Sequence, residues 1–297
     1  MIDLWMEILL LQHKDTNKEN ITSIILCAGE GTRVRDIAKH IPKPLIKIKS
    51  LNNQTILSHL ISNLINLEIE PIVVVTGHLG EQIEDFVISY QLKNKYKKNK
   101  ILVNRSGVQY KLGPLHSFLS ITENNQIYKE NRVFMIFPGD TIFDYNILQE
   151  ALNLLLKNYS LLDNCSIIFY RKIKISSLKE RFKTHDPNLF KTISYLKINK
   201  NGSKIVVREI KQRTLSSFKN KKTIHQVIPI FIFSFRIVQE IKKLANSNRF
   251  KTIREIVNLI IKKEEIFLAL NIDPEYNFYD IDSPIDLNFY DIDSPID

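Results

Sequence analysis

Residues 21–45 read ITSIILCAGEGTRVRDIAKHIPKPL, and this stretch decides the fold. Its first part, Ile21–Cys27, is a short apolar run of the kind that forms a buried strand. The run ends at Ala28–Gly29, and a loop with two glycines and several cations follows it. Ligands of α/β proteins bind in the loops beyond the carboxyl ends of the strands, so the stretch predicts both a strand and a site.

Strand-like and helix-like segments alternate through the first half of the chain. Short apolar runs that predict strands lie at Ile72–Val75, Ile101–Val103, Arg132–Phe137 and Cys165–Phe169. Apolar residues with helical spacing lie between them, at 56–65, 83–90 and 147–155. Such alternation, with nearly continuous apolar strands, is typical of a parallel sheet covered on both faces. We therefore expect an α/β fold with a Rossmann-like, mostly parallel central sheet and helices on both faces.

The second half is less regular. Thr192–Ile198 and Lys204–Ile210 predict a hairpin around the turn Asn201–Gly202. A further strand is expected at Ile228–Phe233 and a last strand at Ile266–Leu270. Between them we expect a helix that begins with a capping box at Thr252 and Glu255. Since no Pro/Gly/Ser-rich linker divides the chain, the hairpin indicates a small inserted β lobe within one domain.

We expect three parts along the sequence: an N-terminal extension at 1–20, one large domain at 21–287, and a tail at 288–297. The tail is a duplication, because Asn277–Asp286 (NFYDIDSPID) recurs identically as Asn288–Asp297. Two copies of an eleven-residue period do not make a solenoid. The simplest interpretation is that one copy is structural and the other dispensable.

Composition places the chain among globular proteins of the cytoplasm. It has 297 residues, of which 44% are hydrophobic and 25% charged. No apolar run approaches the roughly 20 residues that span a bilayer, and Met1–Leu11 lacks the basic start and cleavage site of a signal peptide. The two cysteines, Cys27 and Cys165, each lie in a strand-like run, so we expect both to be buried and reduced.

The formal net charge is +10, which leaves a nucleic-acid partner open as one hypothesis. The lysines are scattered among Ile and Asn, however, and the densest run, Lys93–Lys100, falls between a helix pattern and a strand pattern. We interpret that run as a solvated loop and predict neither a nucleic-acid nor a membrane partner. Excess positive charge also suits an enzyme whose substrates are polyanions.

The loop after Cys27 has the chemistry of a phosphate site. Gly29 and Gly31 allow the backbone to approach a ligand and point N–H groups at it, and Arg33 and Lys43 add positive charge on either side. The loop is not a P-loop, since G-x-x-x-x-G-K-[ST] does not occur, and it is not the dinucleotide fingerprint, since Val34 stands where the third glycine is needed.

Two carboxylate motifs lie further along. Asp140 follows an expected buried strand in Phe137–Pro138–Gly139–Asp140 and is well placed for Mg²⁺, which usually takes one or two carboxylates plus substrate phosphates. Asp280 and Asp282 lie two apart, so on an extended chain they point the same way. The repeat supplies a rival pair, Asp291 and Asp293.

These motifs together resemble the sugar nucleotidyltransferase family. The family has G-x-G-T-R followed by P-K-P, present here as Gly29–Arg33 and Pro42–Pro44, then a G-D motif and a closing D-x-D-[ST]-P-x-D-L segment. The family usually has two consecutive glycines after the alanine, whereas Glu30 stands second here. The resemblance implies the nucleotide-diphospho-sugar transferase fold. It also implies transfer of a nucleoside monophosphate from a nucleoside triphosphate to a sugar 1-phosphate or similar phosphorylated small molecule, with release of pyrophosphate.

The resemblance also implies roles for individual residues. Catalysis is expected from Arg33, Lys43 and Asp140, and Mg²⁺ binding from Asp140 and Asp282. Nucleotide binding is expected from Ala28, Gly29, Gly31, Thr32 and Gly113. Gly113 opens a segment, G-P-L, that touches the nucleobase in the family. Lys211 corresponds, without the proline, to an E-K-P lysine that binds the acceptor phosphate.

Other functions stay open on the sequence. A metal-dependent glycosyltransferase of related fold would use Asp280–Ile281–Asp282 as its D-x-D motif, although the motifs around Arg33 and Lys43 argue against it. A non-catalytic nucleotide-binding protein is the third hypothesis, and the two carboxylates argue against that one. The nucleobase, the acceptor and a homo-oligomeric state are left undetermined.

Overall fold

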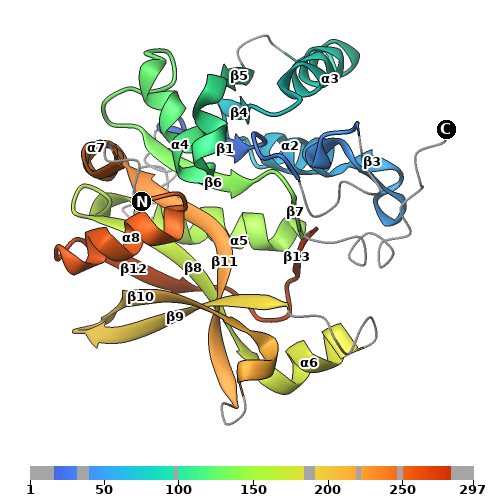
Figure 1. Ribbon diagram of the computed structural model, residues 1–297. Coiled ribbons are helices and arrows are strands. Elements are labelled where there is room, and N and C mark those ends of the chain that lie inside the picture. The colour runs from blue at the N-terminus through green and yellow to red at the C-terminus, as the bar shows by residue number, and fades with distance from the viewer. Residues whose placement is uncertain are drawn as a thin grey trace, which may run out of the picture.

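The computed structural model describes residues 17–31, 40–96, 100–183, 191–218, 222–245 and 250–281. Within these residues nine strands form one central sheet (Figure 1). In spatial order they are β5 (Ile101–Arg105), β4 (Ile72–Thr76), β1 (Ile21–Leu26), β6 (Val133–Pro138), β11 (Thr223–Ser234), β8 (Cys165–Lys174), β12 (Ile266–Asn271), β10 (Lys204–Thr214) and β9 (Thr192–Asn201).

The sheet is mixed, so the expectation of a mostly parallel sheet is not confirmed. Strands β5, β4, β1 and β6 are parallel neighbours. β11 then runs antiparallel to both β6 and β8, β12 is parallel to β8, and β10 is antiparallel to β12 and to β9. An apolar run indicates that both faces of a strand are covered. Helices cover a strand in the middle of a sheet in the same way whether it is parallel or antiparallel to its neighbours. The sequence pattern therefore predicted the strands but not the direction of β11.

Helices cover both faces of the sheet, as predicted. On β1, Ile21 and Ile25 belong to one hydrophobic cluster and Ile24 to the other, because successive side chains of a strand point to opposite faces. The first cluster takes its helical residues from α2 (Ile56–Asn66), α3 (Gly80–Lys93) and α5 (Tyr145–Lys157). The second takes them from α4 (Pro114–Leu119), α7 (Phe235–Ala245) and α8 (Ile253–Lys262). Figure 1 shows α2, α3 and α5 on one side of the strands and α7 and α8 on the other.

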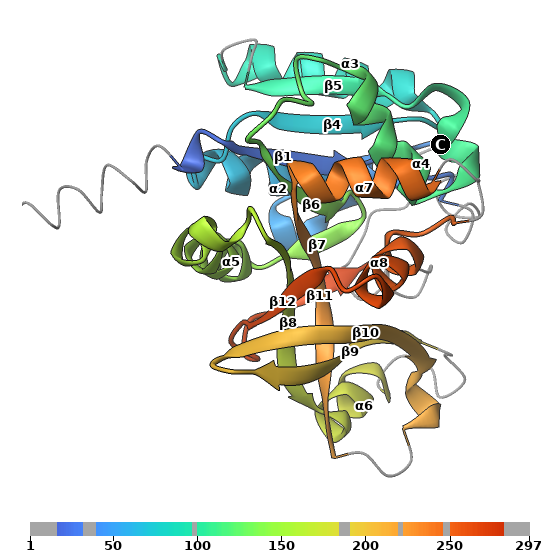
Figure 2. The ribbon, with the colours of Figure 1, turned by 90° about the vertical axis from the view of Figure 1, so that its left-hand side faces the viewer.

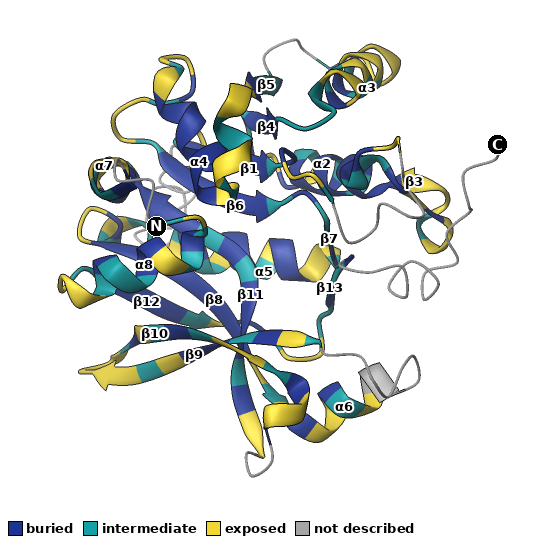
Figure 3. Ribbon diagram, viewed as in Figure 1, coloured by how far each residue is buried: buried dark blue, intermediate teal, exposed yellow. Residues whose placement is uncertain are grey.

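The predicted hairpin is present as β9 and β10, which pair around residues 201–204. It forms the edge of the same sheet, and β9 also contacts β11. A small hydrophobic cluster joins it to α6 (Ile175–Lys183) and to the 3-10 helix η7 (Leu215–Ser217), at the lower end of the molecule (Figure 2). Exposed residues gather at the hairpin tip (Figure 3). That the hairpin acts as a lobe of its own stays a prediction.

Two short ladders lie beside the sheet. One joins β2 (Lys47–Ile48) to β3 (Gln54–Thr55). The other joins β13 (Phe278–Asp280) to β7 (Thr141–Phe143) in antiparallel register. Short 3-10 helices fill further connections, at η2 (Lys43–Leu45), η3 (Lys49–Leu51), η4 (Gly107–Leu112), η5 (Ser120–Glu123) and η6 (Tyr159–Leu161).

Two local predictions are confirmed. The capping box of Thr252 and Glu255 starts α8, and Cys27 and Cys165 are buried free thiols. Among the described residues, no helix has the length and hydropathy of a membrane span. Of the three predicted parts of the chain, the N-terminal extension 1–20 is described only from residue 17. The tail 288–297 lies outside the described residues, as does the end of the large domain from residue 282.

Candidate functional site

The carboxyl ends of β1 and β6 bring together the two motifs that the sequence singled out. The strands are parallel neighbours in which Leu26 lies opposite Pro138, and the Gly139 amide donates to the Leu26 carbonyl at 3.0 Å. The glycine loop 27–31 and Asp140 therefore leave the sheet side by side. This is the edge at which ligands bind in such sheets.

Gly139 permits this close approach. A Cβ atom there would lie 2.6 Å from the Cys27 sulfur and 2.8 Å from the Leu26 carbonyl oxygen, closer than real Cβ contacts. Burial, and secondarily the charge of Asp140, raises the pKa of the Cys27 thiol far above its usual range. The thiol is therefore protonated at neutral pH and acts as a small apolar spacer between the two strand ends.

Lys43 reaches the same place from η2. Its ammonium nitrogen lies 2.7 Å from a carboxylate oxygen of Asp140, and the two side chains are 10% and 37% exposed. The segment after Lys43 is anchored by a small cluster that packs it against β7, formed by Ile46, Ile48, Ile56, Ile142 and Ile281. A cation and a carboxylate far apart in sequence are thus held in contact by apolar packing.

A cavity of about 520 Å³ opens beside this ion pair. The glycine loop forms part of its wall, and Lys43, Asp140 and Gly113 contribute to it. Its lining consists of Leu26, Cys27, Ala28, Gly29, Glu30, Gly31, Lys43, Pro44, Tyr110, Gly113, Pro114, Ser117, Ile136, Pro138, Asp140, Pro229, Phe231 and Ile253. The sequence did not single out Tyr110, Phe231 or Ile253, which reach the cavity only through the fold.

Gly113 holds a conformation that other residues avoid. Its φ is +111°, and a Cβ atom there would lie 2.6 Å from the Lys251 carbonyl oxygen. That carbonyl also accepts a hydrogen bond from the Leu115 amide at 3.1 Å. The start of α4 is therefore pressed against the segment that leads into α8.

We expect Gly113→Ala to lower the free energy of unfolding by about 3 kcal/mol, because backbone strain and the contact with Lys251 add together. Gly107→Ala is the matched control, since Gly107 also has positive φ, +55°, but has no atom within 4 Å of the added Cβ. The control should cost only about 1 kcal/mol. Urea unfolding of both variants measures the difference, and equal costs would contradict the close contact at Gly113.

The C-terminal end of the described chain returns to Asp140. The Ile281 amide donates to the Asp140 carbonyl at 3.1 Å, and the Thr141 hydroxyl donates to the Asp280 carboxylate at 2.6 Å. Within the first copy of the repeat the chain is extended through Asp280. Thr32, Arg33, Asp282 and the rival pair Asp291 and Asp293 lie outside the described residues.

Lys211 lies on β10, and its ammonium is 3.5 Å from the Glu209 carboxylate. It is not among the residues that line the cavity. His116 is buried and shares a hydrogen bond of 3.0 Å with the Phe250 carbonyl. The described residues contain no group of three His, Cys, Asp or Glu side chains that could hold a metal ion by themselves.

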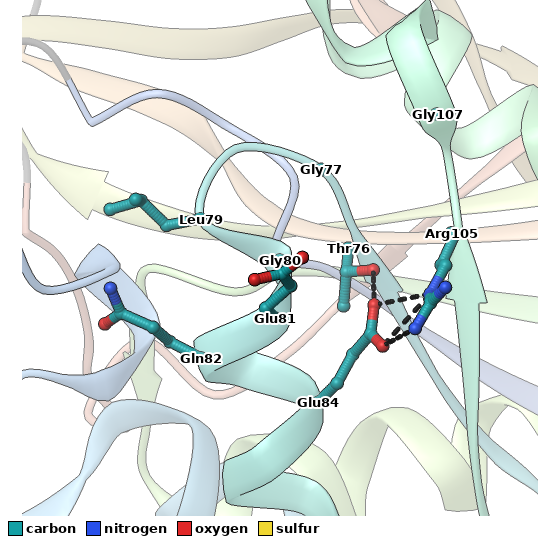
Figure 4. Close-up of a pocket in the computed structure, with 9 residues that line it drawn as sticks. All are labelled: Thr76, Gly77, Leu79, Gly80, Glu81, Gln82, Glu84, Arg105 and Gly107. Atoms are coloured by element: carbon teal, nitrogen blue, oxygen red, sulfur yellow. Dashed lines mark hydrogen bonds and ion pairs between the residues drawn. The ribbon is translucent and has the colours of Figure 1, made fainter.

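A second cavity, of about 380 Å³, lies where β4 and β5 end and α3 begins (Figure 4). Arg105 donates to both carboxylate oxygens of Glu84, from its Nε at 2.9 and 3.0 Å, and Thr76 donates to the same carboxylate at 3.2 Å. These hydrogen bonds to Glu84 raise the pKa of Arg105. Because the charges of Arg105 and Glu84 satisfy each other, we assign this cavity no ligand.

Comparisons with known proteins identify a family for this chain. Residues 22–171, half of the chain, match the protein family described as nucleotidyl transferase. A bifunctional GlmU protein of Methanococcus maripaludis is 34% identical over 131 residues, which cover 44% of this chain and 27% of that protein. The match thus spans about a quarter of that relative's length.

Solved structures share the fold over most of the chain. The inositol-1-phosphate CTP transferase from T. maritima has a TM-score of 0.61 at 17% identity, covering 90% of this chain and 91% of that one. A UDP-glucose pyrophosphorylase complexed with UDP-glucose has a TM-score of 0.64 at 16% identity, covering 91% and 98%.

Proposed function

Because this chain belongs to the nucleotidyl transferase family, we propose that it transfers a nucleoside monophosphate from a nucleoside triphosphate to a phosphorylated small molecule and releases pyrophosphate. One observation carries the proposal: Lys43 and Asp140 meet, 2.7 Å apart, in the wall of a cavity that the glycine loop helps to form. A glycine loop with a cation and a carboxylate beside it suits a triphosphate.

The proposed reaction needs no general base. The acceptor phosphate is already an anion at neutral pH, and one of its oxygens forms a bond to the α-phosphorus. The bond from the α-phosphorus to the bridging oxygen breaks, and pyrophosphate leaves with that electron pair. The barrier comes from bringing two polyanions together, so the protein contributes positioning and fixed positive charge.

Lys43 is proposed to hold the α-phosphate, where its charge stabilises the transition state. Arg33 is proposed to hold the leaving phosphates. Contacts from Ala28, Gly29, Gly31, Thr32 and Gly113 are proposed for the nucleotide. The positions of Ala28, Gly29, Gly31 and Gly113 in the cavity wall support their part.

Among the described residues, the Asp140 carboxylate fits a magnesium site. The Asp140 carboxylate already holds a cation, the Lys43 ammonium, at the edge of the cavity, and carboxylate oxygens are ligands that Mg²⁺ prefers. We propose that Asp140 and Asp282 hold Mg²⁺, which would supply positive charge to the phosphates of both substrates. The Ile281 amide, one residue before Asp282, is bonded to the Asp140 carbonyl, and this supports the first copy of the repeat over the second.

The acceptor is proposed to be a sugar 1-phosphate or a phospho-alcohol. Similar proteins include a UTP–glucose-1-phosphate uridylyltransferase for the first kind and the inositol-1-phosphate CTP transferase for the second. Lys211 remains the proposed acceptor-binding residue, with less support than the others because it pairs with Glu209 away from the cavity. We also propose that residues 21–287 act as one domain and that the protein works in the cytoplasm.

The test is a pyrophosphate-release screen of the nucleoside triphosphates against hexose 1-phosphates, inositol phosphate and phosphocholine, with Mg²⁺. We expect one triphosphate and one acceptor class to stand out, and Asp140→Asn serves as the blank. Melting temperature is the second readout, since a ligand that binds the folded state raises it. Stabilisation by a nucleotide sugar alone, without pyrophosphate release from any pair, would favour the glycosyltransferase hypothesis and refute the proposal.

A further inference from the structure

A buried arginine lies where the chain leaves the sheet for its last described strand. Arg171 on β8 is 1% exposed. The parallel neighbour of β8, β12, ends one position earlier, with Asn271 opposite Tyr170. Residues 272–277 then carry the chain to β13. The cation therefore lies at the branch point between the sheet and the segment that contacts Asp140.

The guanidinium of Arg171 contacts three different parts of the chain. Its Nε donates to the Gln226 side-chain oxygen on β11 at 2.9 Å, and its Nη1 donates to the Tyr276 carbonyl at 2.6 Å. Its central carbon lies 4.8 Å from the centre of the Phe278 ring. A planar group with a fixed fork of donors can meet all three partners only in one arrangement.

The contacts continue from Phe278 to Asp140. The Phe278 ring stacks on Phe143 with the ring centres 6.3 Å apart, and the two residues are opposite each other in the β13–β7 ladder. In the same register Asp280 lies opposite Thr141, and the Ile281 amide bonds to the Asp140 carbonyl. A slip of one residue would turn every side chain of β13 to the other face.

Burying a cation costs desolvation free energy, and apolar residues of similar volume often stabilise a protein as much or more. We propose that Arg171 is a positioning residue that fixes the register of β13 on β7, and thereby sets residues 278–281 beside Asp140. This inference rests on the proposed function for its effect on the reaction. The register itself is a separate, measurable property of the chain.

The experiment compares Arg171→Met and Arg171→Lys with the wild type by hydrogen exchange and by pyrophosphate release. In the Met variant, amides of 276–281 should exchange about 100-fold faster, while those of β1 and β4 change by less than about threefold. The turnover number should fall about 30-fold with the KM for the triphosphate nearly unchanged, because misplacement of reacting groups acts on the chemical step. The Lys variant keeps a donor and a cation and should restore most of the protection.

Arg236→Met is the matched control, since Arg236 pairs with Glu265 through two hydrogen bonds of 2.6 Å on α7, away from β13. It should leave exchange at 276–281 unchanged. Equal loosening of β1, β4 and 276–281 in Arg171→Met would overturn the proposal, since it is the signature of a merely structural role. Unchanged exchange at 276–281, or faster exchange with full turnover, would overturn it as well. If the wild type releases no pyrophosphate from any substrate pair, the proposed function fails, and the exchange data still decide the register.

Discussion

Asp140→Asn should lower pyrophosphate release by about 10³-fold, while the melting temperature stays within a few degrees of the wild type. The substitution keeps the shape of the side chain at the end of β6 but removes the charge that Lys43 contacts at 2.7 Å. If Asp140 also holds Mg²⁺, the cost includes weaker binding of the metal. Metal titration of the rate therefore separates a loss of affinity from a loss of turnover.

Glu84→Gln is the control for Asp140→Asn. It removes a carboxylate at the same edge of the sheet, but one that pairs with Arg105 beside the other cavity. Its rate should stay within about threefold of the wild type, because the pair lies outside the candidate site and an ion pair at the surface contributes little to the stability of the fold. Wild-type turnover in Asp140→Asn, at saturating Mg²⁺, would remove Asp140 from the catalytic residues.

Lys43→Met should lower the turnover number by about 10² to 10³, which corresponds to about 3 to 4 kcal/mol of lost transition-state stabilisation. Methionine keeps an unbranched apolar stem of similar shape, with sulfur in place of one methylene, and lacks the ammonium. Steady-state kinetics at several triphosphate concentrations shows whether the loss falls on turnover, as expected for a charge that acts in the transition state.

Lys100→Met serves as the matched control, since the Lys100 ammonium is paired with Glu70 just before β5 and β4 begin, at the opposite end of the strands from Asp140. The double variant Lys43→Met/Asp140→Asn gives a further test. Residues that act as a unit show strongly non-additive losses, so the double variant should be little slower than Asp140→Asn alone. Strictly multiplicative losses would mean that the ion pair does not operate as one group.

The first half of the fold could be predicted from the sequence because its strands are short apolar runs bounded by clear turn signals. The prediction of Ile72–Val75 corresponds to β4 at Ile72–Thr76, and the helical spacing at 147–155 corresponds to the buried face of α5. Periodicity reports burial, and burial does not depend on strand direction. The antiparallel course of β11 was therefore not predictable in this way.

The candidate site was predictable where local motifs carry it. The sequence indicates Lys43 and Asp140 separately, because a cation near a glycine loop and a carboxylate after a strand are local features. The walls of the cavity were not, since Tyr110 and Phe231 come together only through long-range packing. One feature of the sequence could have indicated Arg171: it is a cation directly after the apolar stretch of β8.

The ladder between β13 and β7 makes the candidate site one of the last parts of the chain to be completed during synthesis. Strands β1, β4, β5 and β6 pair with one another and all lie within the first 138 residues. The contact between Ile281 and Asp140, in contrast, spans nearly half of the chain. A nascent polypeptide therefore contains all four of these strands well before residue 281 is added. It acquires the Ile281 contact only once residue 281 has left the ribosome.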